Sequence, residues 1–132
     1  MRTQAREKAF QLIFERLFTK ENYSLDEEFF ASLKKEEDKV FAKNLVQKFE
    51  ENRLEMQNLI SQNLLNYDIS RVYKVDLALM YLALTEINYF ETPKQVVINE
   101  TLEIAKRFST EKSSKFINGV ISSILKSQNQ GN

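Results

Sequence analysis

Apolar side chains recur along most of this chain at intervals of three and four residues, the spacing that places them on one face of an α-helix. The first such stretch runs from Thr3, as an N-cap, to about Thr19. A second opens with the capping box Ser24-Leu25-Asp26-Glu27 and ends near Glu36. The pattern therefore predicts two helices in the first part of the chain.

A third periodic segment begins at about Asp38. Its apolar series skips a turn at Glu51-Asn52-Arg53, where we expect the helix to bend. Tyr67-Asp68-Ile69-Ser70 then has the composition of a link between two halves of the protein. The segment predicts one long, bent helix that closes the first half.

The second half contains a run from Leu77 to Leu84 that is apolar on every face. In a chain without membrane spans, such a run is typical of a helix surrounded by its neighbours. Pro93 breaks the pattern just before a helix that starts around Gln95, and a final helix follows from about Ser113. We expect the helix from Leu77 to Leu84 to be the hub of this half.

Composition supports an all-α fold, because the 132 residues include only one Pro and two Gly. The absence of Cys and His excludes disulfides, thiolate nucleophiles and the commonest metal ligand. The chain begins with polar residues and has no apolar run of the ~18 to 20 residues that a membrane helix needs, so we expect a cytoplasmic protein. Residues 1–132 are long enough to form one domain with its own core.

Charge is balanced overall, with 19 basic and 19 acidic residues, so no net charge attracts the chain to a polyanion. The distribution is uneven. Residues 20–39 carry a net charge of −3, whereas residues 1–9 carry +2 and residues 106–126 carry +4. If a nucleic acid binds, we expect it at these two basic ends.

Arg2 and Arg6 stand at the start of the first predicted helix, where the helix dipole disfavours cations by about 0.3 to 1 kcal/mol. They also continue the core-facing stripe of Ala9 and Ile13 beyond the end of the core. One interpretation is a projecting basic segment that binds phosphates or bases. The other is an ordinary polar N-terminus.

A second basic cluster surrounds the link between the last two helices and consists of Lys106, Arg107, Lys112 and Lys115. It is interpreted either as a site for phosphates or as a solvated junction between helices.

Two features of the last third indicate structural roles. Asn99 and Glu100 lie among apolar neighbours, where a buried amide or carboxylate needs partners, so we expect them in a structural network. Gly119 falls in the middle of the final helical pattern, where Gly costs about 1 kcal/mol relative to Ala. We expect close packing of that helix against another backbone to explain the glycine.

Catalytic templates find no match in this chain. It has no Gly-rich phosphate loop, no His-bearing metal motif and no Ser or Cys with a His base. The acidic run Asp26-Glu27-Glu28 begins a predicted helix, where the dipole favours it without any chemistry. We therefore expect no enzymatic activity, no catalytic residue, no metal and no cofactor.

Four blocks of residues, taken together and in order, carry a family resemblance that covers essentially the whole chain. They are Ala5-Arg6-Glu7-Lys8-Ala9, Val75-Asp76-Leu77-Ala78-Leu79 with Leu84-Thr85-Glu86, Val97-Ile98-Asn99-Glu100 through Ala105-Lys106, and Lys115-Phe116-Ile117-Asn118-Gly119-Val120. The chain resembles the bacterial transcription antitermination factors of the NusB family. That resemblance implies a fold of about seven helices in two packed bundles, at about residues 1–66 and 70–127.

The resemblance also implies partners. NusB proteins pair with NusE, a protein of the small ribosomal subunit, and the heterodimer recognises single-stranded boxA RNA. The loaded RNA joins an antitermination complex on RNA polymerase, notably in ribosomal RNA operons. No enzymatic step is involved.

Contact positions are implied residue by residue. Those for RNA lie at the start of the first helix and beside the last one: Arg2, Thr3, Gln4, Arg6, Lys8, Lys112 and Lys115. Those for NusE are Phe14, Asp76 and Tyr81. Thr3 and Gln4 depart from the family, which often has further Arg there, so we expect weaker RNA binding by the chain alone.

Other readings remain open from the residues alone. One is a protein-only helical adaptor or homodimer whose aromatic residues bind another chain. Another is a stand-alone RNA-binding domain related to that of ribosomal RNA methyltransferases. A carboxylate-based hydrolase is the remaining enzymatic alternative.

Overall fold

The computed structural model describes residues 2–19 and 29–130 and confirms the all-α class. Within these ranges the chain forms five α-helices and one short 3-10 helix, with no strand. Their bounds are α1 Thr3–Arg16, α2 Glu36–Gln62, η1 Ile69–Arg71, α3 Lys74–Tyr89, α4 Lys94–Phe108 and α5 Glu111–Gln130.

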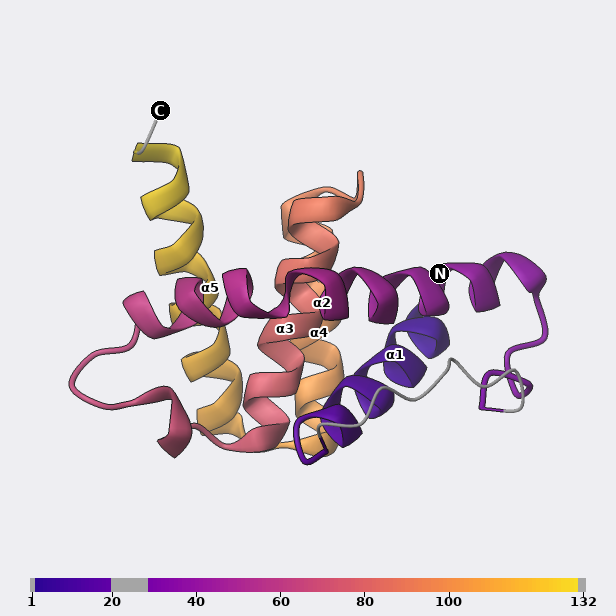
Figure 1. The fold of residues 1–132 in the computed structure, drawn as a ribbon, viewed down its shortest axis with the longest axis horizontal. Helices are drawn as coiled ribbons and strands as arrows, with labels where there is room; N and C mark the ends of the chain where they lie inside the picture. The colour runs from indigo at the N-terminus through magenta and orange to yellow at the C-terminus, as the bar shows by residue number, and fades with distance from the viewer. Residues whose placement is uncertain (1, 20–28, 131–132) are drawn as a thin grey trace.

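Helix α3 is the hub of the fold, as its apolar pattern predicts. It contacts all four other α-helices, and every residue from Asp76 to Glu86 is buried. Helix α2 crosses in front of α3, and α1 lies obliquely below α2 (Figure 1). α3, α4 and α5 run broadly alongside one another behind α2 (Figure 1). The buried side chains of both halves form a single cluster, and the division into two bundles remains a prediction.

The predicted bend in the long helix is confirmed, whereas two predicted ends of α1 are wrong. Asn52 has φ −122° and ψ 16° inside α2, outside the helical region. The N-cap of α1 is Arg2, and no side chain caps it. The helix ends at Arg16, before Thr19.

The predicted helix ending near Glu36 is wrong in the part that the structure describes. Residues 29–32 form a turn and residues 33–35 are irregular, and the capping box at residues 24–27 lies outside the described residues. Phe30 and Leu33 are buried from a turn, in which the Leu33 amide donates to the Phe30 carbonyl over 3.0 Å. The spacing of apolar residues therefore did not require a helix here. The described residues contain fewer helices than the seven expected.

The explanation expected for Gly119 is also wrong. Gly119 is exposed on α5, and a Cβ atom added there would meet no heavy atom within 4 Å. No neighbouring backbone requires this glycine, so no contact in the described fold offsets the free energy that it costs the helix.

Gly119→Ala is expected to raise the free energy of unfolding by about 1 kcal/mol, because Ala favours the helix and the site has room for it. Urea denaturation followed by circular dichroism measures the change. Asn118→Ala, at the adjacent exposed position, is the control and should give a smaller gain. A loss of stability in Gly119→Ala would mean that another group contacts α5 here.

No helix within residues 2–19 and 29–130 is both long enough and apolar enough to cross a bilayer.

Candidate RNA and partner interface

Arg6 does not lie on the surface but in a buried ion network that ties α1 to α3 and α4. Its Nε and Nη2 atoms each donate a 2.7 Å hydrogen bond to the Glu86 carboxylate, eighty residues away. Its Nη1 atom lies 3.7 Å from Glu100 Oε1. Arg6 is 5% exposed and Glu86 is 0% exposed. This two-pronged pairing holds the start of α1 in a fixed position.

Electrostatics keep the Arg6 guanidinium charged despite its burial. Burial by itself lowers the pKa of Arg6, but the hydrogen bonds that Arg6 donates to Glu86 and the charges of Glu86 and Glu100 outweigh it, so the pKa is raised. The expectation that Glu100 belongs to a structural network agrees with this arrangement. Asn99, in contrast, is exposed and accepts a 2.9 Å hydrogen bond from Gln95.

The other predicted RNA residues of α1 lie at or near the surface. Arg2 and Gln4 are exposed, and Thr3 and Lys8 are half-buried. The Arg2 guanidinium lies 4.4 Å from the centre of the Phe41 ring, and Lys8 Nζ lies 4.8 Å from that of Phe29. These cation–π contacts orient both cations while leaving donors available to a ligand.

Thr3 also lines a hollow of about 490 Å³ between the start of α1 and α4. Its hydroxyl donates a 3.4 Å hydrogen bond to Glu100, which joins it to the Arg6 network. Arg107, one of the cations in the second basic cluster, lines the same hollow and forms an ion pair with Glu7. Arg107 is thus already paired within the protein.

Lys112 and Lys115 are exposed on the first turns of α5. Neither forms an ion pair with any residue in the described part of the chain. The helix start that carries them is held by Thr110, whose hydroxyl accepts a 3.1 Å hydrogen bond from the Ser113 amide. The predicted RNA residues therefore lie on two different helices, one group at the start of α1 and the other at the start of α5, and we describe them as two basic sites.

Phe14 belongs to an aromatic patch, which we define as Phe14, Phe18 and Phe108. The rings of Phe14 and Phe18 have centroids 5.1 Å apart. Phe10 lies beneath them, 6.3 Å from Phe14 and 5.4 Å from Phe108. Phe18 is 63% exposed and Phe108 is 43% exposed. Large apolar side chains gathered at the surface in this way are typical of a protein interface.

The family resemblance implied Phe14, and neither it nor the sequence pattern led us to select Phe18 or Phe108. The signal for Phe18 was present, because Phe10, Phe14 and Phe18 follow one another at intervals of four residues along one helix face. Phe108 gave no such signal, since it joins the others only where the end of α4 meets α1.

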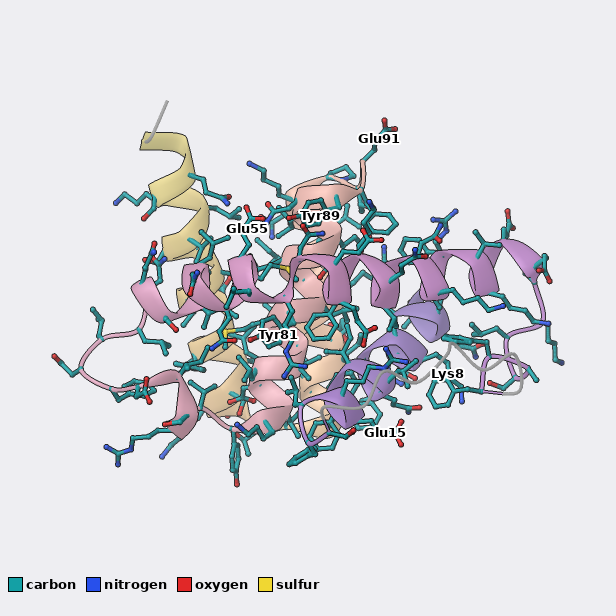
Figure 2. All side chains as sticks on the ribbon, viewed as in Figure 1. Lys8, Glu15, Glu55, Tyr81, Tyr89 and Glu91 are labelled. Carbon is teal, nitrogen blue, oxygen red and sulfur yellow. The ribbon has the colours of Figure 1, made fainter. Side chains whose placement is uncertain are left out.

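Asp76 and Tyr81, the other residues predicted to bind NusE, are both buried. Asp76 lies in the first turn of α3 and accepts a 2.8 Å hydrogen bond from the Ser109 hydroxyl. Tyr81 is 2% exposed and packs against Phe49, with ring centroids 5.0 Å apart. Figure 2 shows Tyr81 near the centre of the molecule, where α3 passes α2. Its ring therefore offers no surface to another protein.

Burial also sets the acidity of Tyr81. The loss of solvent raises the pKa of its hydroxyl, and the nearby Arg53 opposes part of that rise. Tyr81 therefore stays neutral within the core at physiological pH.

No group of three or more acidic side chains in the described ranges is arranged to hold a metal ion. The arrangement offers cations, hydroxyls and exposed rings, which suit binding to phosphates, bases and apolar protein surfaces.

Comparison with known proteins gives one consistent result. The model of the NusB family matches residues 3–126. The transcription antitermination protein NusB of Listeria welshimeri is 43% identical over 124 residues, which cover 93% of this chain and 94% of that protein. The solved structure of T. maritima NusB has a TM-score of 0.85 at 30% identity and covers 96% of this chain and 91% of its own.

A further solved structure contains the antitermination factors NusB and NusE in complex with dsRNA. Its matching chain has a TM-score of 0.86 at 26% identity, with 96% of each chain covered. Because the family model spans nearly the whole sequence and these relatives match over more than nine tenths of their length, the chain belongs to the NusB family.

Proposed function

We propose that this protein is a transcription antitermination factor that binds boxA RNA as a heterodimer with ribosomal protein NusE. In that role it promotes processive transcription of ribosomal RNA operons as part of a complex on RNA polymerase. It acts by binding and not as an enzyme. Its place of action is the cytoplasm, where nascent bacterial RNA is found.

The observation that carries this proposal is similarity along the full chain to NusB proteins, including one solved together with NusE and RNA. A partial match would support only a shared fold. Sequence identity of 43% over nearly all of both chains supports a shared mode of action as well.

Two basic sites on this protein bind the RNA. The first consists of Arg2, Thr3, Gln4 and Lys8 at the start of α1, and the second of Lys112 and Lys115 on α5. Exposed Lys and Arg contact phosphates, whereas hydroxyl and amide groups contact bases and sugars. We give Arg6 a positioning role, because its donors are directed at Glu86 and Glu100.

The aromatic patch, Phe14, Phe18 and Phe108, binds NusE. Clustered aromatic side chains at a protein surface are common centres of binding energy. Asp76 supports this surface from below through Ser109, at the end of α4 next to Phe108. Tyr81 is left out because it is buried.

The double variant Lys112→Ala/Lys115→Ala tests the second basic site. It is expected to weaken the binding of boxA RNA by the NusE complex. It should also make the negative slope of log K against log salt shallower by about 1.4, since each phosphate contact to a single strand contributes about 0.7. Fluorescence anisotropy over a series of salt concentrations measures both quantities.

Lys126→Ala is the matched control, because Lys126 is also exposed on α5 but lies about three turns from Lys115 and about four from Lys112. Its salt slope should equal that of the wild type. An unchanged slope in the double variant would remove Lys112 and Lys115 from the RNA site.

A protein-only adaptor or homodimer is the second candidate, and the exposed aromatic patch favours it. That function predicts association through the patch with no effect of RNA at any salt concentration. Titration of the chain with boxA RNA, with and without NusE, separates the two candidates.

A further inference from the structure

A groove runs along α5 and combines Lys112 and Lys115 of the second basic site with residues that have no role so far. It joins a hollow of about 420 Å³ and one of about 340 Å³, which share Tyr67 and Phe116 in their walls. We call it the α5 groove and define it by Leu65, Tyr67, Lys112, Lys115, Phe116 and Gly119. The end of α2 and the segment that follows it form its other wall, on the left of Figure 1.

Gly119 opens the floor of this groove. Glycine is costly in the middle of a helix, and nothing in the described fold requires it at this position. Its one structural effect is to leave the backbone of α5 uncovered beneath the groove. A helix position without a side chain suits close approach by a ligand.

The walls are aromatic and partly exposed. The rings of Tyr67 and Phe116 have centroids 6.2 Å apart and planes inclined by 32°. Tyr67 is 37% exposed, so part of its ring is available to a planar ligand. Asn63 and Ser123 join the two walls, since the Ser123 hydroxyl donates a 2.6 Å hydrogen bond to Asn63 Oδ1. This hydrogen bond links the two walls of the groove in the absence of a ligand.

The charge of the groove favours an anion. Arg71, Lys112 and Lys115 line the two hollows and are exposed, whereas the acidic residue in the walls, Asp76, is buried and hydrogen-bonded to Ser109. Aromatic rings interleaved with cations are the usual surface for single-stranded nucleic acid, where bases stack and phosphates pair. A protein partner would be expected to prefer the more apolar aromatic patch.

We propose that the α5 groove binds a nucleotide of the single-stranded RNA within or next to boxA. One base stacks on Tyr67 and Phe116 and reaches the α5 backbone at Gly119, while its phosphates lie at Lys112 and Lys115. This inference rests on the proposed function and extends it, because Tyr67, Phe116 and Gly119 have no role in the two basic sites described above.

Gly119→Leu and Tyr67→Ala test the groove directly. The first fills the floor and the second removes a stacking ring. Each is expected to weaken the binding of boxA RNA with flanking single-stranded nucleotides by about tenfold, the effect of losing one stacked base. The measurement is fluorescence anisotropy with the full chain in complex with NusE. Ser127→Leu, at an exposed α5 position outside the groove walls, is the matched control and should bind like the wild type.

Folding and partner binding are measured on the same proteins. Gly119→Leu should keep the helical circular dichroism, because Leu favours a helix more than Gly does. Both variants should bind NusE alone as the wild type does.

The possible failures are distinguishable. Wild-type protein that binds no boxA RNA with NusE would overturn the proposed function, and the groove inference with it. Wild-type binding together with unchanged affinity in both variants would overturn the groove alone. Loss of NusE affinity in the absence of RNA would make the groove a protein interface and would also overturn the inference.

Discussion

Arg6→Ala is expected to lower the free energy of unfolding by about 3 to 5 kcal/mol, since it leaves the carboxylate of Glu86 buried without its cation. Urea denaturation followed by circular dichroism measures the loss. Arg2→Ala is the matched control. Arg2 lies over the same Phe41 ring as Arg6 but is exposed, and its loss should cost about 1 kcal/mol or less.

A double variant separates a positioning role from direct contact with RNA. Arg6→Met/Glu86→Leu replaces the main ion pair by apolar side chains and should recover most of the stability lost in Arg6→Ala. If Arg6 only positions α1, this folded double variant should bind boxA RNA with wild-type affinity. Weak RNA binding by a stable double variant would show that Arg6 contacts RNA. An Arg6→Ala variant as stable as Arg2→Ala would contradict the buried network itself.

Phe18→Ala is expected to weaken the complex with NusE by about thirtyfold, or ~2 kcal/mol, because an exposed aromatic ring packed against neighbouring rings is typical of a binding hot spot. The fold should be unaffected, since most of the ring is exposed to solvent. Isothermal titration calorimetry with purified NusE measures the dissociation constant.

Two variants complete this experiment. Phe108→Ala removes another ring of the aromatic patch and should also weaken binding. Leu54→Ala removes an apolar side chain on α2 that is at least as exposed as those of the patch but does not belong to it, and should leave the affinity unchanged. Wild-type affinity for NusE in all three variants would show that NusE binds elsewhere.

Local sequence patterns predicted much of the fold. The run from Leu77 to Leu84 is apolar all round, and a helix of that kind has nowhere to lie except among other helices. Pro93 fixes its own φ angle and precedes α4 directly. The missing turn in the apolar series around Asn52 marks the place where α2 bends.

Contacts between distant residues were beyond such patterns. Arg6 and Glu86 are eighty positions apart, so nothing in the local sequence distinguishes an inward-facing Arg6 from a surface cation such as Arg2. Tyr81 presents the related difficulty. On a helix buried on every side, helical periodicity gives no direction that could separate an interface ring from a core ring.

The non-helical segment at residues 29–35 shows a third limit. Apolar residues at helical spacing require burial, and a turn can bury Phe30 and Leu33 as well as a helix can. Gly119 shows a different limit. A glycine inside a helix predicts close packing against another backbone, but Gly119 faces outward, and the sequence pattern does not reveal which way it points.

The buried pairing of Arg6 separates two properties that the start of α1 combines. Stability depends on Arg6 inside the network, whereas the proposed affinity for RNA depends on the exposed positions just before it. Changes at Arg2 and Gln4 can therefore raise or lower RNA affinity with little effect on folding. The tip of this helix is a place where binding strength can be adjusted over a wide range on an unchanged scaffold.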